Sequence, residues 1–190
     1  DRYLETIKHL GITNDNLGLD FFLTDEDKVE NLPIDYIVFA IGGKHKTKIL
    51  PTEKIISICN TLNKQTILIG GKEDFERGEK IVSETSNVQN TCGKYSVRQS
   101  AFIMKNAKYV ITHDTGMMHI AAALKKKIYS VWGNTIPIFG MSPYLANPNS
   151  KIIEVENLSC RPCTKIGFEK CPKGHFDCMR KIDENLFLSK

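Results

Sequence analysis

The chain has 190 residues and a mass of 21.5 kDa, which suits one domain with a short appendage. It is 41% hydrophobic and 25% charged, a balance that is ordinary for a globular protein and excludes a collagen-like or low-complexity chain. The longest uninterrupted apolar run, residues 36–41, is far shorter than the roughly 20 residues that a bilayer-spanning helix needs, and no signal-peptide pattern opens the chain. Because the sequence starts at Asp1 without an initiator methionine, we expect a piece of a longer protein.

The formal net charge of +4 is spread unevenly along the chain. Residues 1–35 hold three Lys/Arg against nine Asp/Glu, whereas residues 36–190 hold 23 against 13. The basic body favours an anionic ligand or surface, such as phosphate, nucleic acid or acidic lipid. An ordinary basic domain beside a solvated acidic linker explains the same charges equally well.

Apolar runs and amphipathic segments alternate along the chain. Residues 1–10 predict a short helix, and residues 11–33 an acidic, turn-rich linker. Helices are then predicted at residues 51–63, 72–85 and 115–124. A further helix is predicted to start at its cap Ser96 and to place Val97, Ala101 and Met104 on one face. Strands are predicted at residues 35–41, 66–69, 88–92, 108–112, 128–132 and 152–155.

Continuous apolar strands that alternate with helices indicate a parallel sheet covered on both faces. We therefore predict an α/β, Rossmann-like doubly wound domain over residues 35–157. Residues 1–34 would be an N-terminal helix and acidic linker, and residues 158–190 a Cys-rich basic tail with a C-terminal helix. In such sheets ligands bind beyond the carboxyl ends of the strands, so the turns that follow the strands are the candidate site.

The turns after the first two strands carry residues suited to a nucleotide. Residues 42–48 combine two glycines with three lysines, the last of them Lys48, just before a helix, which suits a diphosphate. A solvated basic loop is the competing interpretation. After the second strand, Glu73 and Asp74 either accept hydrogen bonds from ribose hydroxyls or cap the next helix.

The turn after the fourth strand holds the densest group of polar residues. Asp114 or Thr115 can cap the following helix, and Gly116 in its first turn leaves backbone N–H groups open to an anion. His119 lies about one helical turn further on. This concentration favours a ligand site over a merely capped helix. The turn 132–137 after the fifth strand either walls the same cleft or is a plain loop.

The six cysteines fall into two groups. Cys59 and Cys92 are expected to be buried structural thiols. The other four lie in the basic tail, and we interpret them as structural cysteines, either reduced or disulfide-linked, with a four-thiolate zinc site as the second interpretation. They are Cys160, Cys163, Cys171 and Cys178. The basic charge of the tail also suggests contact with an anionic lipid-linked acceptor or a membrane surface.

Two parts of the sequence resemble family 9 glycosyltransferases, the lipopolysaccharide heptosyltransferases. One is the segment 114–124, Asp-Thr-Gly-Met-Met-His-Ile-Ala-Ala-Ala-Leu, followed by Trp-Gly-Asn-Thr-Ile-Pro at 132–137. The other is the tail, with Leu-Ser-Cys-Arg-Pro-Cys at 158–163, Cys-Pro-Lys-Gly-His at 171–175, and Cys-Met at 178–179.

The resemblance implies one half of a GT-B fold, in which two Rossmann-like halves flank the substrates and this chain is the C-terminal, donor-binding half. It implies that Lys48 contacts the donor diphosphate and that Glu73 takes the nucleotide ribose. It further implies that the diphosphate-sugar region is held by Asp114, Thr115, Gly116 and His119.

The resemblance also implies the reaction: transfer of a heptose from ADP-heptose to a lipopolysaccharide core or related glycan by inverting displacement, without a required cofactor or metal. No catalytic residue is expected in this chain, because the general base belongs to the N-terminal, acceptor-binding half. The expected partners are the nucleotide-sugar donor, a lipid-linked glycan acceptor and that N-terminal domain, with no nucleic acid. The expected location is the cytoplasm, at the inner face of the cytoplasmic membrane.

Two other functions remain open at the level of sequence. The first is a non-catalytic, Cys-rich and zinc-stabilised binding module for nucleic acid or phosphoglycan, although the tail offers few aromatic side chains for stacking on bases. The second, a nicotinamide-dependent dehydrogenase, is disfavoured because no G-x-G-x-x-G fingerprint occurs in the chain.

Overall fold

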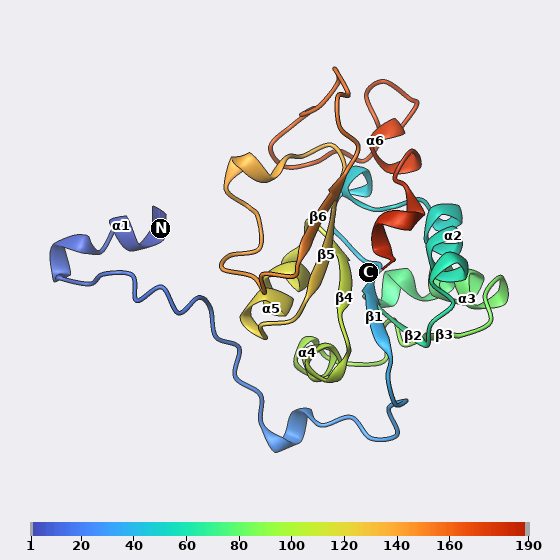
Figure 1. Ribbon diagram of the computed structural model, residues 1–190, viewed down its shortest axis with the longest axis horizontal. Coiled ribbons are helices and arrows are strands. Elements are labelled where there is room, and N and C mark those ends of the chain that lie inside the picture. Colours follow the sequence, from blue (N-terminus) through green and yellow to red (C-terminus); the bar gives the residue numbers. More distant parts are fainter. Residues whose placement is uncertain (1, 189–190) are drawn as a thin grey trace.

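The computed structural model describes residues 2–188 and is built on a parallel sheet with strand order β3-β2-β1-β4-β5-β6 (Figure 1). This order is that of the doubly wound dinucleotide-binding folds. It confirms the predicted α/β, Rossmann-like architecture. The strands are β1 (Ile37–Ala40), β2 (Thr66–Ile69), β3 (Val88–Asn90), β4 (Val110–His113), β5 (Ile128–Trp132) and β6 (Lys151–Glu154).

Strand β1 lies between β2 and β4 and divides its side chains between two cores. Ile37 and Phe39 enter the core on one face of the sheet, and Val38 and Ala40 enter the core on the other. The alternation follows from the two-residue period of a strand. Because both faces are covered, every residue of β1 is buried, as the continuous apolar run predicts.

The helices form a layer on each face of the sheet (Figure 1). Helices α2 (Thr52–Leu62) and α3 (Phe75–Ser83) contribute to the first core, and α4 (Val97–Asn106) and α5 (Gly116–Ala123) to the second. Two single-turn helices, α1 (Arg2–Glu5) and α6 (Asp177–Arg180), lie near the ends of the described chain. Within residues 2–188 no helix is long and apolar enough to cross a membrane.

The N-terminal segment differs in detail from the predicted helix and acidic linker. The helix predicted at residues 1–10 is interrupted, with α1 followed by a separate 3-10 turn at Lys8–Leu10; Asp1 lies outside the described residues. Tyr3 is 90% exposed, and so short a helix gains little stability without a packed face. The linker is fixed to α4, because Arg98 Nε and Nη2 donate to the carboxylate of buried Asp27 at 2.8 and 2.6 Å.

The end of the tail is part of the main core rather than an appendage. Cys178, Met179, Ile182 and Phe187 are all buried in the first core. The predicted C-terminal helix is two short turns, α6 and a 3-10 turn at Glu184–Phe187. The second turn is tied to α2, where Lys54 Nζ lies 2.7 Å from the Glu184 carboxylate.

The order of the strands reverses between β1 and β4, which are neighbours in the sheet although they are far apart in sequence. A crevice forms at the carboxyl ends of such a pair because the two connections leave in opposite directions. The turn after β1 carries Lys48, and the turn after β4 carries Asp114. The fold therefore brings the predicted site residues of both turns to one place.

Candidate functional site

Lys48 and Asp114 form an ion pair across the switch point of the sheet. Lys48 Nζ lies 2.6 Å from Asp114 Oδ2, and the two side chains are 13% and 6% exposed. Thr135, in the turn after β5, donates its hydroxyl to the same carboxylate oxygen at 2.9 Å. Three turns of the sheet edge thus meet at one buried carboxylate.

The N-terminus of α5 lies beside this ion pair and is open. Thr115 occupies the N-cap position, but its side chain makes no capping hydrogen bond, and its buried hydroxyl has no partner within residues 2–188. The space where a side chain at Gly116 would lie contains no atom within 4 Å. The first backbone N–H groups of a helix have no intrahelical acceptor, so this end of α5 is suited to an anion.

His119 is half-buried on the first turns of α5 and is close enough to feel both charges of the ion pair. Burial is the main cause that lowers its pKa; the Lys48 charge also lowers it, while the Asp114 charge raises it. The imidazole is therefore neutral near pH 7. A neutral imidazole has one donor and one acceptor nitrogen, which suits hydrogen bonding to hydroxyl and phosphate oxygens alike.

His113, the last residue of β4, is fully buried beneath the site. Its Nε2 accepts a hydrogen bond from the backbone N–H of Leu50 at 3.0 Å. Burial, with a further contribution from the charge of Arg77, lowers the pKa of His113 to about 3. The neutral ring thus ties the turn that carries Lys48 to β4, a role that no local sequence pattern signals.

The two acidic residues after β2 have separate roles. Asp74 is buried and accepts a hydrogen bond from the Gly71 backbone at 3.0 Å, so it caps its own turn. A side chain at Gly42 would collide with the Asp74 carboxylate, so this glycine serves packing. Glu73 is exposed and, within the described residues, makes no hydrogen bond or ion pair with Lys48 or Asp114.

The tail is fixed to the site by Arg161, a residue that no local sequence motif marks as functional. Its guanidinium donates to the backbone oxygens of Gly133, Val155 and Thr135, the last two at 2.8 and 2.9 Å. It also pairs with the Glu154 carboxylate at 2.8 Å. Arg161 therefore holds the turn after β5, which places the Thr135 hydroxyl on Asp114.

All six cysteines are free thiols, and Cys59 and Cys92 are buried as predicted. In the tail, burial raises the pKa of Cys178 to about 12, against a lowering by the charge of Arg161 and with smaller upward contributions from the other three tail cysteines. The thiol of Cys163 donates to the Cys160 carbonyl at 2.9 Å. Across residues 2–188 no three His, Cys, Asp or Glu side chains are arranged to hold a metal ion.

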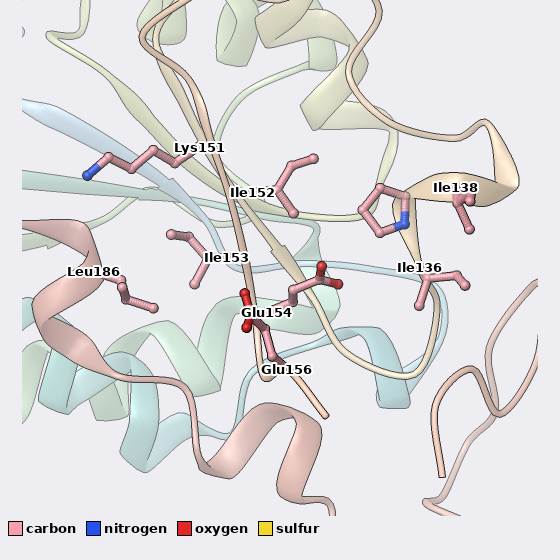
Figure 2. A pocket seen from close by; sticks show the side chains of 9 residues that line it. Ile136, Ile138, Lys151, Ile152, Ile153, Glu154, Glu156 and Leu186 are labelled. Carbon is pink, nitrogen blue, oxygen red and sulfur yellow. The ribbon is translucent and has the colours of Figure 1, made fainter. Parts of the chain in front are cut away.

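A pocket lies away from these residues, against the edge strand β6 (Figure 2). It has a volume of about 720 Å³, and four of its nine lining residues are isoleucines, with the side chains of Ile152 and Ile153 in its middle. Lys48, Asp114 and His119 do not line it. The chemistry of the chain is therefore gathered at the carboxyl edge of the sheet and not in this open apolar pocket.

Comparison with known proteins agrees with this geometry. The family model described as glycosyltransferase family 9 (heptosyltransferase) matches residues 14–172. Lipopolysaccharide heptosyltransferase 2 of Salmonella typhimurium is 30% identical over 80 residues, which cover 40% of this chain and 23% of that protein. Glycosyl transferase family 9 from Veillonella parvula has a TM-score of 0.66 at 24% identity, over 76% of this chain and 46% of that one.

A further solved structure, E. coli heptosyltransferase WaaC with ADP-2-deoxy-2-fluoro heptose, has a TM-score of 0.52 at 28% identity. That match covers 56% of this chain and 36% of WaaC, so the chain spans less than half the length of each of these relatives. The family match covers most of the sequence, including the turns that carry Lys48 and Asp114. The chain therefore belongs to glycosyltransferase family 9.

Proposed function

We propose that this chain is the donor-binding half of a heptosyltransferase and that it binds ADP-heptose at the carboxyl edge of its sheet. The observation that carries the proposal is the buried Lys48–Asp114 ion pair at the switch point, in front of the open N-terminus of α5. One relative of the chain was solved with an ADP-heptose analogue, which supports the choice of donor.

The diphosphate is the part of the donor that this site fits best. Lys48 supplies a positive charge from one side, and the N-terminal N–H groups of α5 supply partial positive charge from the other. When the sugar is transferred, negative charge grows on the departing diphosphate. Groups fixed in advance stabilise that charge without reorganising, so the ordered Lys48 lowers the barrier to transfer.

The remaining site residues fit the rest of the donor. Lys48 and Thr135 both contact Oδ2 of Asp114, so Oδ1 can accept a hydrogen bond from a hydroxyl group of the sugar. The neutral His119 lies on the same side of the helix end and can hydrogen-bond the sugar-phosphate linkage. Glu73, exposed after β2, is assigned to the nucleotide ribose, as the resemblance implies.

The acceptor and the general base belong to a second half of the enzyme, since this chain spans less than half of its relatives. In the complete enzyme a base on that half removes the proton of an acceptor hydroxyl on a lipopolysaccharide core or related glycan. The hydroxyl oxygen attacks the anomeric carbon, and ADP leaves from the opposite side. A single displacement of this kind inverts the anomeric configuration and takes place at the cytoplasmic side, where nucleotide sugars are found.

Calorimetric titration of the chain with ADP, UDP, GDP and NAD, followed by the matching nucleotide sugars, tests the proposal. We expect selective ADP binding that is lost in Asp114→Ala, because that change removes the partner that orders Lys48. Selective UDP or GDP binding would keep the glycosyltransferase but exclude the ADP-linked donor. If none of the nucleotides binds, the donor-half assignment is wrong.

A further inference from the structure

The two edges of the sheet differ in composition. Strand β3, at one edge, has only three residues, and two of them are the polar amides Gln89 and Asn90. Strand β6, at the other edge, reads Lys-Ile-Ile-Glu, pairs with β5 in unbroken register and pairs with no other strand within residues 2–188. An edge strand exposes unpaired backbone N–H and C=O groups, which proteins protect with short, polar or proline-containing strands. The apolar centre of β6 has no such protection.

A continuous groove runs along the free side of β6. The pocket of Figure 2 and a second hollow of about 370 Å³ share Ile136, Glu154 and Glu156 as lining residues. Together the two hollows follow the chain from Lys151 to Leu158. The groove therefore has the elongated form of a site for an extended strand.

Both faces of the sheet contribute apolar side chains to this groove. Figure 2 shows Ile152 on one side of the strand, toward Ile138, and Ile153 on the other side, toward Leu186. Ile138 is 83% exposed, Ile152 is 46% and Leu186 is 41%. A strand that paired with β6 would place successive side chains on alternate faces, so it would cover these residues on both. Exposed apolar residues gathered in this way mark an interaction site.

The charges at the two ends of the groove indicate which strand fits. Lys151 stands at the amino end and Glu156 just beyond the carboxyl end; both are exposed, and neither forms an ion pair with another side chain within residues 2–188. When two copies of β6 pair antiparallel, the amino end of each strand lies beside the carboxyl end of the other. Lys151 of each copy then approaches Glu156 of the other, whereas a parallel arrangement would bring like charges together. The groove is thus complementary to itself.

We propose that two copies of this chain associate through β6, the two strands pairing antiparallel about a two-fold axis near Ile152 and Ile153. The two sheets then join into one, and the backbone groups of both free edges are hydrogen-bonded. The contact closes on itself and uses up the β6 edge of each copy, so the assembly stops at a dimer. The carboxyl edges of the two sheets, and with them the two donor sites, point in opposite directions. No residue that holds the donor takes part, so the proposal goes beyond the proposed sugar transfer.

Sedimentation equilibrium over a range of protein concentrations tests the proposal. We expect the wild type to associate reversibly from the chain mass of 21.5 kDa to twice that mass, and no further. Ile152→Lys places two ammonium groups in the paired edge and should weaken dimerisation on the order of 100-fold. The matched control is Ile34→Lys, which changes an isoleucine that is 90% exposed in the loop before β1 and should dimerise like the wild type. Because both positions are exposed, both variants should keep the far-ultraviolet circular dichroism spectrum of the wild type.

Reversing the end charges tests the antiparallel arrangement. Lys151→Glu alone puts acidic side chains at both ends of the groove, and Glu156→Lys alone puts basic side chains at both ends. Each single change should weaken dimerisation by about tenfold, because opposite charges are replaced by like charges. The double variant exchanges the two ends and should dimerise nearly as well as the wild type. Such a recovery is expected only if residues 151 and 156 of different copies face each other.

Backbone hydrogen exchange gives a second measurement that needs no variant. The N–H groups of residues 151–154 that point away from β5 should exchange more slowly at concentrations where the dimer forms than at concentrations where the chain is monomeric. A wild type that stays at the chain mass at every concentration would overturn the proposal. Equal dimerisation of Ile152→Lys and Ile34→Lys, a double charge variant weaker than both single variants, or exchange in β6 that does not depend on concentration would also overturn it.

Discussion

The backbone N–H of Leu50 lies 3.0 Å from Nε2 of His113, and this hydrogen bond joins the turn after β1 to the last residue of β4. The bond requires a neutral imidazole, because a protonated histidine has no acceptor nitrogen. The ion pair between Lys48 and Asp114 joins the same two turns, so they are linked twice, once by a hydrogen bond and once by an ion pair. The position of Lys48 therefore depends on a buried side chain that does not itself contact a ligand.

The pH dependence of stability should reveal this neutral histidine. The pKa of His113 is about 3 in the folded protein, whereas an unfolded histidine titrates near 6.5. Between these values the unfolded state binds more protons, so stability falls as the pH drops below 6.5, by at most about 1.4 kcal/mol per pH unit. Urea unfolding at several pH values between 4 and 7 measures this dependence. In His113→Gln, which keeps an acceptor for the Leu50 N–H but does not titrate, the unfolding free energy should change less steeply with pH. An identical slope in both proteins would contradict the buried neutral imidazole.

Gly116 allows stability and ligand binding to be separated. A methyl group at this position meets no atom within 4 Å, so Gly116→Ala should leave the fold intact and raise its stability by up to about 1 kcal/mol. The same methyl group would occupy the space through which a phosphate approaches the N–H groups of α5. ADP affinity should therefore fall by about tenfold, measured by calorimetry beside thermal melting. A variant with unchanged affinity would show that the helix end does not hold the diphosphate.

Arg161 should be a determinant of stability in the tail. Arg161→Met removes the donor for the carbonyls of Gly133, Val155 and Thr135 while keeping much of the side-chain volume. Loss of these buried hydrogen bonds and of the Glu154 pair should lower the free energy of unfolding by on the order of 3 kcal/mol.

The matched control for this change is Lys181→Met, which removes a cation whose ion pair with Asp177 is exposed. Exposed pairs contribute little, so this variant should change the unfolding free energy by less than about 1 kcal/mol. Urea denaturation measures both variants, and similar small losses in the two would mean that Arg161 does not anchor the tail.

The sheet could be predicted from sequence because each central strand is a continuous apolar run of the right length. The strands β1, β2, β4 and β5 coincide with these apolar runs to within a few residues, and each run ends at a glycine or polar turn. Because the strands are parallel, their carboxyl ends lie at one edge of the sheet. The sequence alone therefore predicts that Lys48 and Asp114, which follow two of these strands, lie at the same edge.

Features that depend on distant contacts could not be predicted in the same way. The segment 11–33 has no helical or strand period, yet Asp27 fixes it to Arg98, a residue 71 positions later. The link between Leu50 and His113 spans 63 positions, and Arg161 acts on backbone oxygens whose positions only the folded sheet defines. The helix predicted for residues 1–10 is interrupted because its apolar side chains, such as Tyr3, find no surface to pack on.

The most direct test of the donor site compares ADP with adenosine in Lys48→Ala and Lys46→Ala. Lys46 is an exposed lysine in the same turn, so it controls for the change in net charge. If Lys48 holds the diphosphate, Lys48→Ala should weaken ADP binding by about 10- to 100-fold and leave adenosine binding nearly unchanged. Lys46→Ala should change neither by more than about threefold. Equal losses for ADP and adenosine in Lys48→Ala, or equal effects of the two variants on ADP, would contradict the assignment of Lys48 to the diphosphate.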